Sequence, residues 1–377
     1  MRVLMTTDCV GGVWTYTMTL CRALQRHGVE ITLAITGGPM SNAQTREVDQ
    51  IANVDWHHRP YRCEWMQPPL ADVAAAGEWL ESLWDECVPD VVHLNDFAHG
   101  NRWFGHCPRL IVAHSDVVSW HRAVRQQDPD DSWNAYRVAV AGGLGEADAV
   151  VGLTEGGLAE VCDAFCVRPR RRRVIYNATD LYPRSSKFGE PFILAAGRLW
   201  DEAKNLDVLA VAAEGLPWPV KLAGDPQHPD GGSAAESNAN VELLGPVSHG
   251  RLVSLMSEAT IFAAPARYEP FGLAIAEAAR CGCALLLGRI PSLYELWRED
   301  VRYFDPFGFN DGIHSMPGND PDVLRDILAQ MIDRPDALHR QGVAAMERSL
   351  VFDPRVQAAA YHDLYIELAK SGRGGAQ

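Results

Sequence analysis

Residues 261–288, IFAAPARYEPFGLAIAEAARCGCALLLG, are the stretch that decides the fold of this chain. The apolar run at the start of this stretch predicts a buried strand, and a polar turn carrying Glu269 follows it. An alanine-rich segment from about Phe271 then predicts a helix that is closed by Gly282. A helix that opens at Gly272 presents free backbone N–H groups and a partial positive charge, which together favour an anion.

Glu277 lies about two turns into the predicted helix, and helical side chains lean back toward the N-terminus. Its carboxylate can therefore reach a group that lies beside the bound anion. A ribose suits this position, because both of its hydroxyls can donate to a carboxylate. A single helical glutamate is more often solvated on an exposed face, but here Glu269 and Glu277 occur together around a glycine. Taken alone, the stretch predicts a site for a nucleoside diphosphate that carries a sugar.

The length, composition and charge of the chain indicate which kind of protein it is. A chain of 377 residues favours two domains, and 47% hydrophobic with 22% charged residues is typical of a soluble globular protein. A net charge of -15 argues against a nucleic acid as the general partner. The start of the chain lacks the apolar region of a signal peptide, and no apolar run approaches the roughly 18 residues that span a bilayer. Nine scattered cysteines favour reduced thiols, so the sequence predicts a cytoplasmic protein.

The amino-terminal segment predicts a parallel α/β sheet. A strand over about residues 2–6, a turn with Gly11 and Gly12, a helix over about residues 14–27 and a strand over residues 29–35 form a βαβ unit. The paired glycines allow the backbone to approach a phosphate closely, with a plain tight turn as the alternative. The turn lacks the G-x-G-x-x-G pattern, which disfavours a nicotinamide-dependent dehydrogenase.

Polar side chains follow two further predicted strands, at residues 91–94 and 110–113. Asp96 and His114 therefore lie beyond the carboxyl ends of strands, where open α/β sheets bind their ligands. A histidine at a strand end is equally often a hydrogen-bonded loop residue, so both interpretations stay open for His114. His93 is expected to pack inside its strand.

Two charged segments allow more than one interpretation. Arg168 and Arg170–Arg173, here called the basic cluster, could touch anionic lipid or an acidic acceptor. A solvated loop that enters a strand at residues 174–176 is the favoured alternative. Asp128 and Asp130 are predicted to belong to a solvated acidic loop and not to a metal site.

A second α/β unit is expected to begin after a linker at residues 183–191, which is rich in proline, serine and charge. A strand at residues 192–196 leads to Arg198 and Lys204, six positions apart around a turn into a helix. Arginine binds phosphate in a bidentate manner and lysine acts as a mobile point charge, so the two suit a diphosphate. Each of them alone is more often a surface charge.

These segments resemble the retaining GT-B glycosyltransferases, the family 4-like and group 1 type with an E-x7-E motif. The E-P-F-G-L-x-x-x-E-A signature matches residues 269–278, and the phosphate clamp of the family matches the segment from Arg198 to Lys204. His114 is similar to the family's histidine that faces the transferred sugar. Residues 177–180, NATD, resemble the family's N-G-x-D segment, with Ala178 in place of the usual glycine.

The resemblance implies an α/β, GT-B fold with two Rossmann-like parallel-sheet domains that face a cleft. Residues 1–182 would be the acceptor domain and residues 191–350 the nucleotide-sugar domain. Residues 351–377 would form a C-terminal helix that returns to the first domain, followed by a tail. The implied reaction transfers a sugar, with retention, from a UDP-, GDP- or ADP-sugar to a hydroxyl acceptor. That acceptor would be a sugar, a lipid-linked sugar or a small metabolite.

The resemblance also implies the roles of the site residues. The catalytic residues would be Arg198, Lys204, His114 and Glu269. The donor-binding residues would be Gly11, Gly12, Val247, Phe271, Gly272, Leu273 and Glu277. Neither a cofactor nor a metal is expected, because the two cations replace a metal at the diphosphate. Nucleic acid is not an expected partner, and the basic cluster suggests a weak contact with the inner face of the membrane.

Two other functions stay open on this sequence. A nucleotide-sugar epimerase of the same fold would need further acid–base groups that the sequence does not identify. A non-catalytic nucleotide-sugar binding protein is disfavoured because the four charged residues of the motifs, Arg198, Lys204, Glu269 and Glu277, are all present. Acceptor recognition is expected from loops at about residues 37–70 and 115–137.

Overall fold

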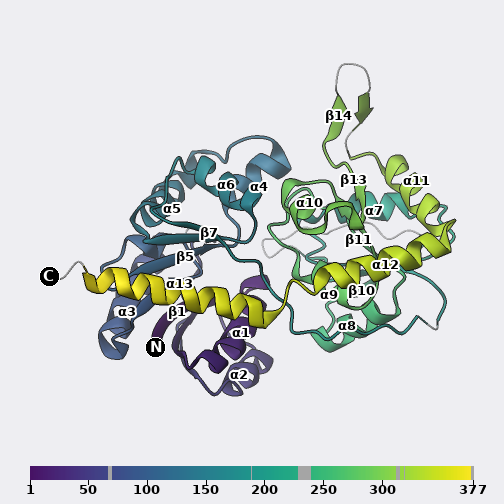
Figure 1. Ribbon diagram of the computed structural model, residues 1–377. Coiled ribbons are helices and arrows are strands. Elements are labelled where there is room, and N and C mark those ends of the chain that lie inside the picture. The colour runs from purple at the N-terminus through teal and green to yellow at the C-terminus, as the bar shows by residue number, and fades with distance from the viewer. Residues whose placement is uncertain (67–69, 188, 228–238, 311–314, 318, 375–377) are drawn as a thin grey trace. The chain divides into compact units, whose positions relative to one another are not determined.

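The computed structural model describes residues 1–66, 70–187, 189–227, 239–310, 315–317 and 319–374 (Figure 1). The chain divides into two compact units. The first unit comprises Met1–Asp180 together with Phe352–Gln377, and the second comprises Leu181–Val351.

The sheet of the first unit has seven parallel strands in the described residues, in the order β3-β2-β1-β4-β5-β6-β7. The strands are β1 (Arg2–Asp8), β2 (Glu30–Thr36), β3 (Val54–His58), β4 (Val91–Leu94), β5 (Arg109–Ala113), β6 (Ala149–Gly152) and β7 (Arg172–Val174). The central strands β4, β5 and β6 are almost continuously apolar and buried, as expected for a parallel sheet that helices cover on both faces.

Helices connect these strands and cover the sheet of the first unit (Figure 1). They are α1 (Gly12–Leu24), α2 (Asn42–Asp49), α3 (Leu70–Cys87), α4 (Val117–Arg125), α5 (Asn134–Glu146), α6 (Glu155–Ala164) and α13 (Pro354–Gly374), with short helices η1 (Gln25–His27), η2 (Ala98–Asn101) and η3 (Asp131–Trp133). The C-terminal helix α13 packs against α1 and β4, so the end of the chain completes the unit that its beginning forms. The segment that leads to α13 is fixed by a hydrogen bond from Thr179 N to Phe352 O (3.2 Å).

The second unit repeats the same architecture around a sheet of six parallel strands in the described residues, in the order β10-β9-β8-β11-β12-β13. Its strands are β8 (Ile193–Ala196), β9 (Val220–Ala223), β10 (Val241–Gly245), β11 (Ile261–Ala264), β12 (Ala284–Gly288) and β13 (Arg302–Phe304), and a separate antiparallel pair is formed by β14 (Gly308–Asn310) and β15 (Ser315–Pro317). Its helices are α7 (Leu206–Ala212), α8 (His249–Glu258), α9 (Leu273–Arg280), α10 (Pro291–Trp297), α11 (Pro321–Ile332) and α12 (Pro335–Ser349), with η4 (Glu202–Lys204) and η5 (Arg298–Asp300).

In both sheets the strand order reverses at one point. The chain progresses outward from β1 through β2 to β3 and then returns to place β4 on the other side of β1. The second unit does the same with β8, β9, β10 and β11. Such a reversal leaves a crevice beyond the carboxyl ends of the two central strands, where this class of fold binds ligands. The topology therefore marks the loops after β1 and β4, and after β8 and β11, as binding loops.

The structure corrects several predicted elements. The strand expected at residues 174–176 is β7 (Arg172–Val174), so two arginines of the basic cluster lie in an edge strand, where an exposed face needs no apolar side chains. The segments at residues 37–70 and 115–137, expected to be loops, contain α2, β3 and α4. Helix α4 was missed because it is short and polar on one face, although Asp116 caps it by accepting a hydrogen bond from Ser119 N.

The backbone at the carboxyl ends of the second sheet is closely packed. Gly224, which follows β9, has a φ of 150°, and a Cβ atom there would lie 1.7 Å from the carbonyl oxygen of Gly197, which follows β8. A Cβ on Gly288, at the end of β12, would lie 2.0 Å from Ala266 O. Side chains are therefore excluded at these positions. The loops after β8 and β9 approach each other through their backbones, and so do those after β11 and β12.

The substitution Gly224→Ala should lower the thermal stability of the second unit markedly, because the new methyl group overlaps the rigid Gly197 carbonyl. A loss of about 2 kcal/mol or more is expected, since the backbone itself has to move. Gly250→Ala is the matched control. Gly250 lies in α8 with no atom within 4 Å of its added Cβ, and this exchange should stabilise the helix by roughly 0.5–1 kcal/mol. Melting curves of both variants test whether Gly224→Ala is less stable than Gly250→Ala. Equal melting temperatures of the two variants would contradict the prediction.

Candidate functional site

The loop after β8 positions the two predicted cations of the second unit. The stem of Lys204 passes beside Gly197, and its carbon atoms lie at ordinary van der Waals distance, 3.5–3.7 Å, from the position that a Cβ of this glycine would take. Asp201 caps η4 by accepting a hydrogen bond from Ala203 N, and its other oxygen accepts one from Arg198 Nη2 at 2.7 Å. Arg198 is thus held at the mouth of the turn with its side chain half exposed.

The loop after β11 brings a carboxylate to Lys204. Arg267 N donates to Ala203 O at 2.9 Å, which ties this loop to η4. Glu269 Oε2 then accepts a hydrogen bond from Lys204 Nζ at 2.6 Å. The two side chains are only 23% and 16% exposed, so the ion pair is shielded from solvent and is stronger than a surface pair. Ser292 Oγ, which the sequence analysis missed, donates to the backbone oxygen of Glu269 at 2.6 Å.

Helix α9 begins directly after this loop. Gly272 is its N-cap residue with a φ of 85°, a left-handed conformation that favours glycine. Phe271 is buried before it, and Leu273 is the first helical residue, two positions later than predicted. Because Gly272 carries no side chain, the helix opens with its first backbone N–H groups and its positive dipole end uncapped by a side chain.

Glu277 occupies the buried side of α9, where its side chain is 9% exposed. His249, the first residue of α8, places Nε2 at 2.8 Å from Glu277 Oε1. The sequence carries no local signal for this partner, because 28 positions separate the two residues. Val247, predicted to bind the donor, lies half-buried in the turn between β10 and α8. Glu277 therefore lies in the same unit as the ion pair of Lys204 and is oriented by a neighbouring helix.

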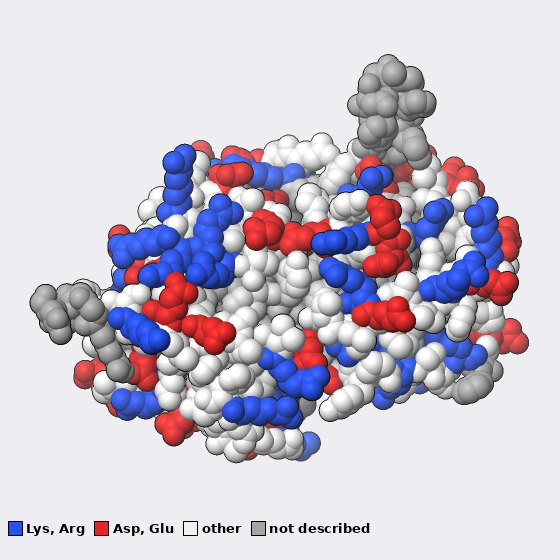
Figure 2. Space-filling model, viewed as in Figure 1, with Lys and Arg blue, Asp and Glu red and all other residues white. Residues whose placement is uncertain are grey.

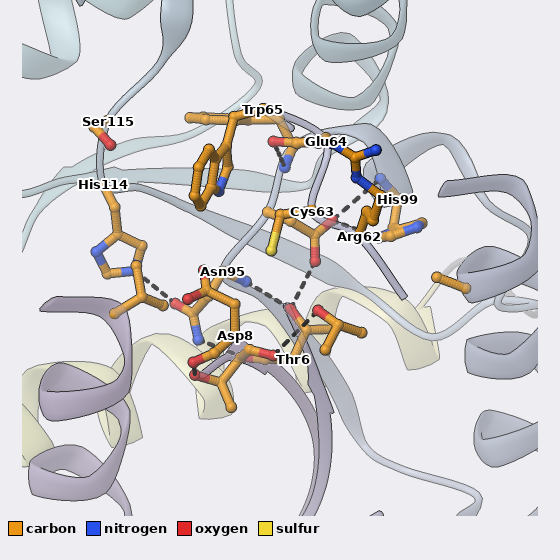
Figure 3. A pocket seen from close by; sticks show the side chains of 16 residues that line it. Thr6, Asp8, Arg62, Cys63, Glu64, Trp65, Asn95, His99, His114 and Ser115 are labelled. Atoms are coloured by element: carbon orange, nitrogen blue, oxygen red, sulfur yellow. Dashed lines mark hydrogen bonds and ion pairs between the residues drawn. The ribbon is translucent and has the colours of Figure 1, made fainter. Parts of the chain in front are cut away.

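The first unit carries a pocket at its own strand-order reversal (Figure 3). The pocket encloses about 620 Å³ with its open mouth included, and residues from the ends of β1, β2, β4 and β5 line it. Among them are Asp8, Asn95 and His114, and a segment that contains Cys63, Glu64 and Trp65 closes another side. Gly11, with a φ of 70°, precedes Gly12, the first residue of α1, so the predicted glycine turn lies after β1 as expected.

An acidic and basic cluster that the sequence analysis missed lines one wall of this pocket. The carboxylate of Glu64 accepts hydrogen bonds from Phe97 N (3.0 Å) and Ala98 N (2.7 Å), while Asp96 Oδ1 lies 2.7 Å from His99 Nδ1. Burial, together with the charge of Asp96, raises the pKa of Glu64 to about 7. Burial would lower the pKa of His99, but the charge and hydrogen bond of Asp96 raise it to about 9. Only Asp96 had a sequence signal, as a polar residue after a strand.

His114 follows β5 and lines the same pocket. Its Nε2 lies 2.8 Å from Asn95 Oδ1, and Tyr16 packs edge-on against its ring with centroids 4.6 Å apart. Burial lowers the pKa of His114 to about 3, so its imidazole is neutral. His93 is fully buried in β4, as expected, and burial lowers its pKa to about 3 as well.

Basic side chains gather on the first unit near β7 and α13 (Figure 2). Three of these arginines form ion pairs within the unit. Arg171 Nε donates to Glu367 of α13 at 3.0 Å, and Arg173 Nη2 donates to the same carboxylate at 3.1 Å. Arg170 lies 3.5 Å from Asp148. The basic cluster therefore fastens the edge strand to the C-terminal helix, and the expected lipid contact stays a prediction.

The cysteines, the acidic loop and the helix lengths can be compared with the predictions from sequence. All nine cysteines lie in described residues and are free thiols. Asp128 pairs with Arg122 and Arg137, which agrees with a charged surface loop. Within the part of the chain that the structure describes, each helix is too short or too polar to cross a bilayer.

Comparison with known proteins identifies the family. The model of Glycosyltransferase Family 4 matches residues 10–182, and the model of Glycosyl transferases group 1 matches residues 180–348. The chain belongs to the GT-B glycosyltransferases. D-inositol 3-phosphate glycosyltransferase of Xylanimonas cellulosilytica is 30% identical over 190 residues, which are 48% of this chain and 43% of that relative. The chain thus matches less than half of the length of this relative.

Solved structures show the same fold. Sucrose-phosphate synthase from Thermosynechococcus elongatus aligns with a TM-score of 0.76 at 16% identity, covering 98% of this glycosyltransferase and 99% of that chain. Anabaena HepE in complex with UDP and glucose aligns with a TM-score of 0.70 at 14% identity, covering 97% and 100%. At these identities the comparison establishes the fold, and the two Rossmann-like sheets are those of a GT-B glycosyltransferase.

The buried His93 predicts how the stability of the first unit depends on pH. Its pKa is about 3 in the folded chain and about 6.5 in the unfolded chain, so between these values the unfolded chain binds more protons. The free energy of unfolding should therefore fall as the pH drops below about 6.5, by about 1.4 kcal/mol per pH unit from this residue.

Urea denaturation of the wild type and of His93→Gln between about pH 7 and pH 5 tests this expectation. The variant lacks the titrating group, so its stability should depend less steeply on pH even if it is lower throughout. Parallel pH dependences in the two proteins would contradict the assignment.

Proposed function

We propose that this glycosyltransferase transfers a sugar, with retention of its anomeric configuration, from a nucleotide-diphosphate sugar to a hydroxyl acceptor without a metal ion. The observation that carries the proposal is the shielded 2.6 Å pair of Lys204 and Glu269 beside the open start of α9 at Gly272. This arrangement places a cation, a carboxylate and a helix N-terminus together.

The positive groups of the second unit suit the leaving group of such a reaction. When the bond from the anomeric carbon to the phosphate oxygen breaks, negative charge collects on the diphosphate while the sugar becomes positively charged. Lys204, Arg198 and the N-terminus of α9 would stabilise the charge on the diphosphate, as preorganised electrostatic groups do. The acceptor oxygen then bonds to the anomeric carbon on the face that the phosphate leaves, and its proton passes to the leaving phosphate oxygen.

We assign the two carboxylates to holding the donor. Both already have basic partners in the structure, Lys204 for Glu269 and His249 for Glu277, and an acid–base pair of a glycosidase would need one carboxyl group kept protonated. Glu277 would accept hydrogen bonds from the ribose hydroxyls, and Glu269 from hydroxyls of the donor sugar. Val247, Phe271 and Leu273 would contribute the remaining contacts to the nucleotide.

In the first unit we assign the pocket at Asp8, Asn95 and His114 to sugar and acceptor hydroxyls. Carboxylate, amide and neutral imidazole groups are hydrogen-bond partners that suit hydroxyl groups. Gly11 and Gly12 would allow the backbone to approach the donor. The acceptor is a sugar, a lipid-linked sugar or a small metabolite, and we place the reaction in the cytoplasm or at the inner face of the membrane, where the basic cluster would touch anionic lipid.

The HepE structure contains UDP and glucose, which makes UDP-sugars the first donors to test, ahead of GDP- and ADP-sugars. A bound donor stabilises the fold in proportion to its affinity, so a thermal-shift screen of the three nucleotide classes identifies it. The donor is then incubated with candidate acceptors. Release of nucleotide that requires an acceptor supports a transferase, conversion of the donor sugar without release supports an epimerase, and binding without either supports a non-catalytic protein.

Lys204→Ala and Arg198→Ala should each lower turnover by roughly 100-fold or more, because each removes a preorganised positive charge from the leaving diphosphate. Circular dichroism should show that both variants stay folded. Lys221→Ala is a matched control, since Lys221 is a lysine of the same unit that pairs with Glu242 and is 26% exposed, against 23% for Lys204. Near-wild-type turnover in both site variants would exclude this assignment.

Turnover should persist within about twofold when EDTA is added in excess, because protein cations take the role that a metal ion has in other transferases. Initial rates of nucleotide release with EDTA and after re-addition of Mg²⁺ or Mn²⁺ measure this. Loss of activity that either ion restores would show that the reaction depends on a metal.

A further inference from the structure

A chain of buried polar groups runs from the C-terminal helix α13 to His114. Tyr365 Oη lies 2.6 Å from His93 Nδ1, His93 Nε2 lies 3.3 Å from Asn95 Oδ1, and the same oxygen lies 2.8 Å from His114 Nε2. Tyr365 and His93 have no exposed surface. Asn95 is thus the junction between the core of the first unit and the histidine in its pocket.

The amide group of Asn95 can adopt only one orientation. Its Nδ2 lies 2.7 Å from the carbonyl oxygen of Thr6, which can only accept a hydrogen bond. Its backbone N donates to Thr6 Oγ1 at 2.8 Å, and that hydroxyl in turn donates to Asp96 Oδ2 at 2.8 Å. The donor face of the amide therefore points at β1, and Oδ1 points at the imidazole of His114 (Figure 3).

This orientation fixes the position of the proton on His114. Asn95 Oδ1 can only accept, so the Nε2 atom of His114 must carry a proton, and its Nδ1 then carries a lone pair because the buried ring is neutral. His93 differs from His114 in this respect, because the hydroxyl of Tyr16 also lies 3.3 Å from its Nε2 and a hydroxyl can either donate or accept.

We propose that Asn95 is a positioning residue that holds His114 as its Nε2–H tautomer, so that Nδ1 presents a hydrogen-bond acceptor to the ligand. A group that binds Nδ1 must then be a donor, such as a sugar hydroxyl, and a phosphate or carbonyl oxygen is rejected at this position. The identity of that ligand as a sugar rests on the proposed function, whereas the tautomer is a property of the protein alone.

Nitrogen-15 NMR of the histidine side chains tests the proposal on the full chain without any ligand. Two-bond correlations between the ring nitrogens and ring protons distinguish the two neutral tautomers, and the signals of His114 are assigned by their loss in His114→Gln. The wild type should show His114 with a protonated Nε2 near neutral pH and a slowly exchanging Nε2–H proton. A protonated Nδ1 on His114 would overturn the proposal.

The substitution Asn95→Leu removes the group that accepts the Nε2–H proton of His114. Exchange of this proton should become about tenfold faster, because one hydrogen bond that protects it is lost. Tyr365→Phe is the matched control, because it removes another hydrogen bond of the same chain and leaves the contact of Asn95 with Thr6 O intact. It should lower stability but leave the tautomer and the exchange rate of His114 unchanged.

If both variants speed exchange of the His114 Nε2–H proton equally, His114 responds only to general destabilisation of the unit. That result would overturn the role of Asn95. If Asn95→Leu does not fold, the wild-type tautomer still decides the question. The NMR measurement needs no sugar nucleotide, so its result does not depend on finding a transfer reaction. The proposed tautomer and the proposed function can therefore be disproved independently of each other.

Discussion

The reversal of strand order in each sheet is the constraint on which the sites depend. Beside β1 and β4, and again beside β8 and β11, neighbouring loops diverge to opposite faces and leave the carboxyl ends of the strands accessible. In the second unit the backbones approach so closely there that Gly224 and Gly288 cannot carry a Cβ atom. The charged side chains of the site are consequently supplied by loops whose backbones are fixed by packing.

Local sequence signals predicted most of the architecture. The strand, turn and helix at residues 261–282 could be predicted because an apolar run, Gly272 and an alanine-rich helix are adjacent in the chain. The alternation of strands and helices predicted two parallel sheets for the same reason. Element ends were less predictable, since β7 lies at a sheet edge where the arginines of the strand are exposed and give no apolar pattern.

The candidate site could be predicted only in part. Its motif residues are close in sequence, but the partners that orient them are not: His249 for Glu277, Glu64 for the backbone at Phe97, and Tyr365 for His93. Nothing in a single sequence connects positions that are 28, 33 and 272 residues apart. These contacts depend on tertiary packing, which by burial also lowers the pKa of His93 and His114.

The return of α13 to the first unit also has a consequence for biosynthesis. Tyr361 and Tyr365 are fully buried against Tyr16 and His93, groups that are translated hundreds of residues earlier. On the ribosome, the amino-terminal part therefore cannot complete its core until residues up to Tyr365 have emerged. The second unit, which is continuous in sequence, can reach its native state first, so the order of maturation is the reverse of the order of synthesis.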